Sequence, residues 1–527
     1  MAETQNPNYQ INAAFLGIQR RAEGVDRPTL VQTFVDIGPL FRVLSSKDHQ
    51  IVYGRRGTGK THALLYLAEQ DKQGSAPVYV DLRYIGSSGG MYGDPAVPIQ
   101  QRATRLLLDV LGALHETLLN YAVDASLDLS AIGPALDRLA QASTEVEVVG
   151  ETHRESSFTE SDDHEDKSTA QLSIDAKPAI AMSTTDVDKT HREAQAKQAE
   201  TGTARYRVHF GGTSKALAGL AKAISPHRML VILDEWSTVP FDLQPYLADL
   251  VRRALFPVQG ITVKIAAIEQ RSNFMLGAHS DYTGIEIGAD ASADVDLDDY
   301  MVFDNNADKA VQFFQELLFR HYKSETIAKP KFETSDGLIQ AAFTQKNAFE
   351  DFVKAAEGVP RDAFNVLSVA AQRDMNEAIS IPTIRVAARQ WFQRDKEGAI
   401  RSNMDAQDLL HWIIDEVIAH RRARAFLLKS GTRHPLIDSL FDARLLHVIK
   451  RSISAKDQPG VRYDAYKLDY GCYVDLLATA KAPTNELFEE GILPEDGAAG
   501  VKVPTDDYRA IRRAILDLDQ FEKRAKE

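Results

Sequence analysis

Cysteine is almost absent from this chain, which has a single thiol, Cys472, in 527 residues. One thiol excludes an intrachain disulfide framework and a zinc site built from several thiolates. The chain also lacks an uninterrupted run of about 20 apolar residues, the length that a membrane-spanning helix needs. Its first residues have no basic group leading into an apolar stretch, so we expect no secretory signal. These absences predict a cytoplasmic protein with no membrane contact.

Positive charge is also scarce, because 61 Lys and Arg residues stand against 75 Asp and Glu, a formal net charge of −14. This balance disfavours contact with nucleic acid over the whole surface. The charge is uneven, however. Residues 145–200 contain fourteen acidic and six basic residues (net −8), and residues 421–467 contain four acidic and eleven basic residues (net +7). The asymmetry indicates one segment that repels polyanions and one that attracts them, or simply two solvated surfaces.

What is present is the composition of a globular protein, with 44% apolar and 26% charged residues. The length predicts two to four domains. Apolar strand candidates at 51–53, 78–82, 229–234 and 261–268 alternate with helical patterns, of which residues 100–121 are the clearest. This alternation predicts an α/β core, a parallel sheet with helices on both faces.

A polar stretch at residues 143–203, rich in Ser, Thr and Asp, interrupts this pattern. Two weakly alternating pieces, 146–149 and 171–176, predict a hairpin inside it. The scarcity of aromatic residues and the negative charge favour a solvated excursion. We interpret the stretch as an insertion between two core elements, part flexible and part β, whose function the sequence does not reveal.

Residues 54–61, Gly-Arg-Arg-Gly-Thr-Gly-Lys-Thr, match the phosphate-loop pattern G-x-x-x-x-G-K-[ST] between an apolar strand and a helix-forming run. The glycines let backbone N–H groups point inward around phosphate oxygens, and the helix adds its positive end. Lys60 would bridge the β- and γ-phosphates of ATP, and the Thr61 hydroxyl would ligate Mg²⁺. The predicted nucleotide-binding residues are Gly54, Gly57, Thr58, Gly59, Lys60, Thr61 and His62.

The apolar strand at 229–234 ends in two adjacent carboxylates, Asp234 and Glu235. At a strand terminus both side chains can reach one cleft. Asp234 would hold the hydration shell of Mg²⁺ together with Thr61, and Glu235 would polarise the attacking water. A lone strand ending in Asp-Glu is a weak signal, but after a complete phosphate loop it favours ATP hydrolysis over simple binding.

Together these residues resemble an AAA+ ATPase. A helical stretch also carries Gly358-Val-Pro-Arg361, which is similar to the second sensor of the initiator clade, the origin-recognition and helicase-loader ATPases. The resemblance covers residues 34–477 and suggests a bacterial member. It implies a parallel sheet sandwiched by helices, a helical lid, and a mostly helical, winged-helix-like C-terminal domain. The implied divisions are an N-terminal segment (1–40), the core with its insertion (41–300), the lid (301–375), the winged-helix-like domain (380–480) and a tail with a terminal helix (481–527).

The resemblance also implies sensor residues. The first sensor should follow the strand at 261–268, where Gln270 and Asn273 both qualify, and we take Asn273 as the candidate. Arg361 would reach from the lid to the γ-phosphate; the alternative is an ordinary surface arginine at a helix start. An arginine from a neighbouring subunit usually completes such a site. The candidates for this arginine are Arg252, Arg253 and Arg271. For any one of them, the role of an ordinary solvated arginine is commoner than that of an arginine acting in a neighbouring subunit.

The C-terminal region combines predicted helices at 406–420 and 435–452 with wing-like strands at 461–476. Lys and Arg residues on such a unit can neutralise DNA phosphates, and tyrosines can stack on bases, although core packing is the commoner role of tyrosine. The basic candidates are Arg421, Arg422, Arg424, Lys429, Arg433, Arg444, Lys450, Arg451 and Lys456. The aromatic candidates are Tyr463, Tyr466, Tyr470 and Tyr473.

We therefore expect a Mg²⁺-dependent ATPase whose nucleotide state controls homo- or hetero-oligomeric assembly on DNA or on a partner protein. The alternative is a nucleotide-driven signalling switch, for example in anti-phage defence, that acts on a separate effector protein without DNA contact. Both hypotheses use ATP and Mg²⁺ as cofactors. Salt-dependent binding of duplex DNA distinguishes them.

Overall fold

The computed structural model describes most of the chain. The described residues are 6–149, 203–474 and 515–524, apart from short stretches at 37, 72–73, 86–91, 93, 95, 144–145, 207, 225–226, 279–280, 299–306, 328, 421–422, 424, 433 and 455–459.

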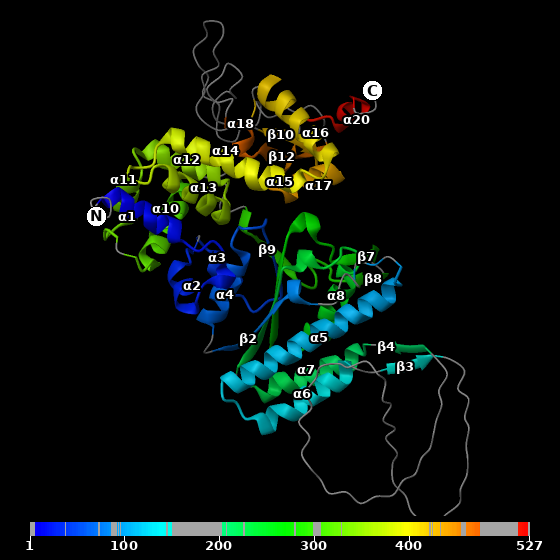
Figure 1. Ribbon diagram of the computed structural model, residues 1–527. Coiled ribbons are helices and arrows are strands. Elements are labelled where there is room, and N and C mark those ends of the chain that lie inside the picture. Colours follow the sequence, from blue (N-terminus) through cyan, green and yellow to red (C-terminus); the bar gives the residue numbers. More distant parts are fainter. Residues whose placement is uncertain are drawn as a thin grey trace, which may run out of the picture.

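A five-stranded parallel sheet forms the core of the first half (Figure 1). The central strands are near-continuous apolar runs because a parallel sheet is buried on both faces. The strands, in spatial order, are β2 (Ser75–Asp81), β5 (Arg228–Asp234), β6 (Ile261–Ala267), β1 (Gln50–Tyr53) and β9 (Ser292–Asp296). The predicted parallel α/β core is confirmed.

Helices cover both faces of the sheet, and β5 shows how. Met229, Val231 and Leu233 join one apolar cluster, and Leu230 and Ile232 join another, as strand alternation requires. The first cluster includes α5 (Ile99–Asp124), α6 (Leu129–Ser143), α7 (Phe210–Ala223) and α8 (Gln244–Leu250). The second includes α3 (Leu40–Leu44) and α4 (Lys60–Gln70), and α2 (Arg27–Thr33) packs against α4.

Helix α5 is long and apolar enough, by length and composition alone, to cross a membrane. Its buried residues recur at helical spacing, as in Leu107, Val110, Leu111 and Leu114, and they pack into the cluster on β2 and β5. This pattern is also that of a core helix, because one apolar stripe faces a sheet.

The insertion leaves and re-enters the core at one place. Helices α6 and α7 pack together, and beyond them β3 (Val146–Val149) and β4 (Thr203–Tyr206) pair antiparallel, with Val149 opposite Thr203. The partner of β3 is therefore residues 203–206, at the far end of the predicted insertion. Residues 150–202, including 171–176, lie outside the described part of the chain.

Four helices, α10 (Ala307–Ser324), α11 (Ser335–Ala342), α12 (Lys346–Ala356) and α13 (Pro360–Arg373), form the lid. The N-terminal helix α1 (Pro7–Gly17) packs on α13 (Figure 1). The Asn12 amide donates to the carbonyl oxygens of Asp374 (2.7 Å) and Glu377 (3.0 Å) at the end of α13. The first forty residues therefore do not stand apart, because α1 joins the lid and α2 contacts α4 and α10.

The C-terminal region, residues 381–474, combines helices with a three-stranded antiparallel sheet of order β10-β12-β11. Its elements are α14 (Ile381–Trp391), α15 (Glu397–Ile400), α16 (Met404–Ile413), β10 (Ala425–Lys429), α17 (Pro435–Asp442), β11 (Leu446–Ser454), β12 (Arg462–Leu468) and α18 (Tyr470–Tyr473). The helix predicted at 435–452 is half wrong, because α17 ends at Asp442 and β11 follows. The winged-helix identity of this region stays a prediction.

Shorter elements complete the described part of the chain. Helix α16 continues in a π-helical segment to His420, which fits the helix predicted at 406–420, and a helix, α20 (Leu518–Arg524), lies in the tail as expected. A hairpin of β7 (Met275–Ala278) and β8 (Asp281–Gly284) follows β6. The remaining short helices are 3₁₀ segments at Ala22–Gly24, Leu82–Tyr84, Trp236–Thr238 and Glu269–Arg271, and π segments at Val251–Leu255, Phe392–Lys396 and Ile414–His420.

Candidate nucleotide-binding site

The phosphate loop joins the carboxyl end of β1 to the first residue of α4, Lys60. Gly59 precedes that helix with a left-handed φ of 96°, a conformation that residues with side chains rarely adopt. Gly57 has a φ of 87°, and a Cβ atom there would lie 2.8 Å from Cβ of Arg361 in the lid. These two glycines therefore let the loop curl and let the lid approach it to direct contact.

The Lys60 side chain lies inside the loop. Its Nζ donates to the carbonyl oxygens of Gly54 (2.7 Å) and Arg55 (3.0 Å). Burial lowers the pKa of Lys60, while the carboxylates of Glu235 and Asp234 act in the opposite direction. The ammonium group is thus held where the loop would enclose a phosphate.

Asp234, at the end of β5, collects hydroxyl and amide donors from three places in the sequence. Thr61 Oγ1 donates to its Oδ2 (2.6 Å), Tyr79 OH donates to the same oxygen (2.8 Å), and the backbone N–H of Glu235 donates to Oδ1 (2.8 Å). Burial, followed by the charge of Asp234, raises the pKa of Tyr79. The structure thereby brings together Thr61 and Asp234, the two predicted Mg²⁺ ligands.

Glu235 has a left-handed backbone, with φ of 57°, which costs a residue other than glycine about 1–3 kcal/mol. The turn is held because the Thr238 hydroxyl and backbone N–H both donate to the Glu235 carbonyl oxygen (2.7 and 2.9 Å). Glu235 and Thr238 line the same cavity as the phosphate loop. Arg83, which pairs with Asp81 and Glu23, also lines it, and the sequence analysis did not identify it.

Arg361 reaches the loop from the lid. Its backbone N–H donates to the Gly57 carbonyl oxygen (3.2 Å), and its side chain lines the cavity. Burial, and then the nearby Arg444, lowers the pKa of Arg361. Its buried Nε has no hydrogen-bond partner among the described residues. Arg361 thus brings a buried, unused donor next to the phosphate loop, and its role as second sensor stays a prediction.

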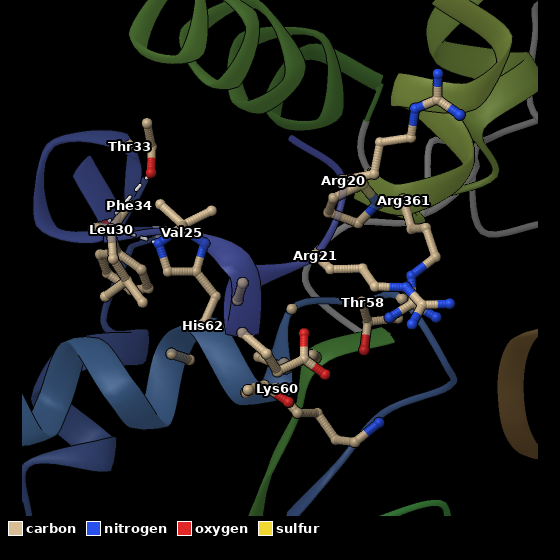
Figure 2. Close-up of a pocket in the computed structure, with 18 of the residues that line it drawn as sticks. Arg20, Arg21, Val25, Leu30, Thr33, Phe34, Thr58, Lys60, His62 and Arg361 are labelled. Carbon is tan, nitrogen blue, oxygen red and sulfur yellow. Dashed lines mark hydrogen bonds between the residues drawn. The ribbon is translucent and has the colours of Figure 1, made fainter. Parts of the chain in front are cut away.

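The cavity has a volume of about 330 Å³, and the N-terminal segment supplies one of its walls (Figure 2). Figure 2 shows Val25, Leu30 and Phe34 together beside α4. The apolar lining residues include Val25, Leu30, Phe34, Leu297, Phe313, Leu317 and Phe364. An apolar wall next to a phosphate loop suits a nucleotide base. No motif in residues 19–35 predicted such a role.

His62, predicted to bind the cofactor, turns toward that wall and away from the phosphate loop. Its Nε2 lies 2.8 Å from the carbonyl oxygen of Leu30, and its ring meets Phe34 edge-on at 5.6 Å. Burial lowers the pKa of His62. The structure therefore places the His62 ring against the wall formed by the N-terminal segment, in the same cavity as the phosphate loop.

Asn273 and Gln270 do not line this cavity. They line a second one, between the segment after β5 and helix α17, and the Asn273 backbone N–H donates to Gln244 Oε1 (2.7 Å). The role of Asn273 as first sensor stays a prediction, since the structure does not bring its side chain to the phosphate loop.

The three candidate trans arginines all have partners within the chain. Arg252 and Arg253 pair with Asp249 (2.8 and 2.9 Å), and Arg271 pairs with Asp442 of α17 (3.1 Å). None of the three lines the nucleotide cavity. A trans role for one of them stays a prediction.

Some of the basic residues predicted to contact DNA in the C-terminal region already pair with carboxylates of the same chain. Arg444 pairs with Asp362 (3.4 Å) and Asp395, and Arg451 donates to Glu269 (2.9 Å). Lys429 is exposed on β10. The residues that lie outside the described part are Arg421, Arg422, Arg424, Arg433 and Lys456.

The four tyrosines pack in the interior, as the commoner interpretation held. Tyr463, Tyr470 and Tyr473 are buried, and Tyr466 stacks on Phe426 with ring centroids 5.8 Å apart. In this structure they present no stacking surface for bases.

The loop at the end of β1 and the Asp-Glu pair at the end of β5 define a P-loop nucleotide-binding protein. Residues 19–86, which hold the N-terminal wall, the loop and β2, match the family model described as ORC-CDC6-like. The predicted resemblance to initiator-type AAA+ ATPases is thereby confirmed, and ATPase activity is a property of that family. The bacterial source stays a prediction.

A search of curated proteins finds no significant match. Among solved structures, the chain is similar to Cdc6p from Pyrobaculum aerophilum, with 12% identity, a TM-score of 0.31, and coverage of 88% of this chain and 95% of that chain. It is also similar to the Aeropyrum pernix Orc1 protein in complex with DNA, with 12% identity, a TM-score of 0.33, and coverage of 84% of this chain and 93% of that chain. A third similar structure is Drosophila ORC bound to DNA, with 9% identity, a TM-score of 0.30, and coverage of 87% of this chain and 92% of that chain. These likenesses are distant, and the fold described above rests on the strand order itself.

Proposed function

We propose that this chain is a Mg²⁺-dependent ATPase. The observation that carries the proposal is the contact between Thr61 Oγ1 and Asp234 Oδ2 (2.6 Å), with Glu235 and Lys60 on the same cavity. A hydroxyl and a carboxylate are the oxygen donors that Mg²⁺ accepts, and Mg²⁺ usually needs only one or two protein ligands beside phosphates. When bound, Mg²⁺ would neutralise charge that develops on the transferring phosphoryl group.

The residues of the chain divide the remaining work. The loop amides and Lys60 bind the phosphates, and Arg361 adds positive charge from the lid. Glu235 is held at the cavity by its strained turn, and it contacts Asp234 through its backbone N–H rather than through its carboxylate. Its carboxylate is therefore the group that can accept a proton from the attacking water.

Glu235→Gln tests this division. The variant should keep its affinity for ATP, because loop and lid contacts remain, and should hydrolyse ATP at least about 100-fold more slowly. Lys60→Ala should weaken ATP binding itself. Binding of a fluorescent ATP analogue and phosphate release by purified protein measure the two effects. Hydrolysis by Glu235→Gln at the wild-type rate would remove Glu235 from the mechanism.

We further propose that the nucleotide state controls oligomeric assembly on DNA or on a partner protein, in the cytoplasm. The initiator-type resemblance supports DNA as the partner, and the exposed Lys429 on β10 offers a phosphate contact.

One observation supports the second candidate, a switch that acts on a separate effector, as in anti-phage defence. Arg444 and Arg451, two of the basic residues expected to meet DNA, are held in ion pairs with Asp362 and Glu269. A cation that is already paired gains less from a DNA phosphate.

The full chain with ATP distinguishes the two candidates through its binding to a fluorescent DNA duplex at increasing salt. Assembly on DNA predicts affinity that falls steeply with salt and weakens in Lys429→Glu. The effector hypothesis predicts no binding at any salt concentration, with ATP hydrolysis intact.

A further inference from the structure

Two neighbouring arginines in the N-terminal segment point in opposite directions. Arg21 has an extended backbone (φ −128°, ψ 126°), and successive side chains on extended backbone alternate sides. Arg20 turns to the lid, where it donates to Asn365 Oδ1 (2.7 Å) and Ser368 Oγ (2.8 Å) of α13. Arg21 consequently turns to the phosphate loop, and Figure 2 shows its side chain extending toward Thr58.

Arg21 and Arg361 approach each other there. Both line the nucleotide cavity, and the charge of Arg21 helps lower the pKa of Arg361. In Figure 2 the two guanidinium groups meet beside Thr58. Two cations from separate elements repel, so their convergence costs energy unless an anion lies between them.

Two carboxylates lie near these arginines: Glu23, whose charge also acts on the pKa of Arg361, and Glu235. Glu23, two residues after Arg21, pairs with Arg83 (2.9 Å), and Glu235 lies across the cavity at the end of β5. No ion pair of Arg21 occurs among the described residues. The cations Arg21 and Arg361, with Lys60 below them, therefore surround a space in which the phosphates of a nucleotide are the matching charge.

We propose that Arg21 contacts the terminal phosphate of ATP from within the same chain, as a second arginine opposite Arg361. This inference rests on the proposed ATPase function and adds a residue to its site. Because Arg20 fastens the same segment to α13, the terminal phosphate would join the N-terminal segment, the lid and the loop. Loss of that phosphate on hydrolysis would remove this shared contact and free one of these three elements from the other two.

The test compares the affinities of Arg21→Ala for ATP and ADP with those of wild type, by titration of full-length protein with fluorescent nucleotides. A charge-assisted contact at the open side of the cavity should weaken ATP binding about tenfold, with ADP binding changed less than about twofold. Arg21→Lys should recover part of the ATP affinity. Arg21 is exposed, so the melting temperature without nucleotide should equal that of wild type.

Arg27→Ala is the matched control, since Arg27 lies in the same segment and forms only an exposed pair with Glu69. It should leave both affinities unchanged. Equal losses of ATP and ADP affinity in Arg21→Ala, or no loss, would overturn the inference. Failure of the wild-type protein to bind either nucleotide would contradict the proposed function instead, so the two failures are distinguishable.

Discussion

At the scale of single residues, Asp249 controls two of the three arginines that were candidates for action in trans. Its carboxylate is buried and also accepts a hydrogen bond from the Gly284 N–H (3.3 Å). The Arg253 side chain is 51% exposed, against 23% for Arg252 and 40% for Arg271. Arg253 can therefore reach a neighbouring subunit with the least loss of contacts inside its own chain.

We expect Arg253→Ala to bind ATP normally and to hydrolyse it about 100-fold more slowly or worse, because an arginine finger contributes at least that much. Mixing it with Glu235→Gln should restore partial activity, since some mixed interfaces then contain both intact residues. Phosphate release as a function of mixing ratio and protein concentration measures the effect.

Arg252→Ala, which loses a pair with the same Asp249, is the control and should hydrolyse ATP at the wild-type rate. A rate per protomer that does not depend on protein concentration, in a protein that stays monomeric with ATP, would exclude the trans arrangement.

Some site residues could be predicted and others could not. Lys60 and Thr61 belong to a local motif of fixed spacing, and Asp234 ends a recognisable strand. Tyr79 could not be predicted from the sequence. Its hydroxyl reaches the Asp234 carboxylate only because β2 pairs with β5, with Asp81 opposite Asp234. Arg21 could not be predicted for a similar reason, since its direction depends on the docking of Arg20 on a helix far along the chain.

At the scale of elements, the short hairpin of β3 and β4 supports the interpretation of residues 143–203 as an insertion. The ends of the two strands are already paired, and the helices that lead into them pack together. Replacing residues 150–202 with Asn-Gly would close the hairpin with a two-residue turn of a favoured type.

This deletion should leave ATP affinity within about twofold of wild type, because loop closure depends weakly on loop length and the nucleotide cavity includes no residue of the hairpin. It should alter partner choice or strengthen DNA binding, since it removes twelve acidic residues that would compete with DNA for the basic region. Nucleotide titration, thermal melting and DNA binding of the purified variant measure these effects. Aggregation, or loss of ATP binding, would show that the segment belongs to the fold.

Apolar runs made four of the five sheet strands predictable, and helical periodicity did so for α5, whereas β9 was not predicted and context decided the weaker cases. Residues 446–452 were expected to be helical, but the pairing of Leu446 with Leu468 and of Val448 with Tyr466 makes them part of a strand. Propensity is a weak prior where a partner strand supplies the hydrogen bonds.

At the scale of the whole molecule, buried ion pairs connect the C-terminal region to both sides of Arg361. On one side, the Glu357 carboxylate pairs with Lys467 (2.6 Å) and accepts a hydrogen bond from the Tyr470 N–H (3.0 Å). The Glu357 carbonyl oxygen accepts a hydrogen bond from Arg55 of the phosphate loop (3.2 Å). On the other side, Asp362 pairs with Lys396 (3.0 Å). A movement of β12 is thereby coupled to the helix start that carries Arg361.

Lys467→Met should destabilise the protein by about 3–5 kcal/mol, because it leaves a buried carboxylate without its cation. Adding Glu357→Gln should recover most of that stability while ATP hydrolysis stays about tenfold low, because Arg361 has lost its anchor to β12. Thermal melts and phosphate release for both single variants and the double variant form the cycle. Full ATPase activity in a stable double variant would show that the pair is structural only.

The parallel sheet has one more consequence, for how the gene could be divided. Strands β1 and β2 precede the insertion and β5, β6 and β9 follow it, yet the order β2-β5-β6-β1-β9 interleaves the two groups. Two polypeptides divided at the hairpin could not each form half of the sheet, because β1 lies between β6 and β9. If the two polypeptides were expressed together, their strands would have to assemble into one sheet. Only that assembly would bring Thr61 into contact with Asp234. Nucleotide binding would thus measure the assembly of the two polypeptides into one folded protein.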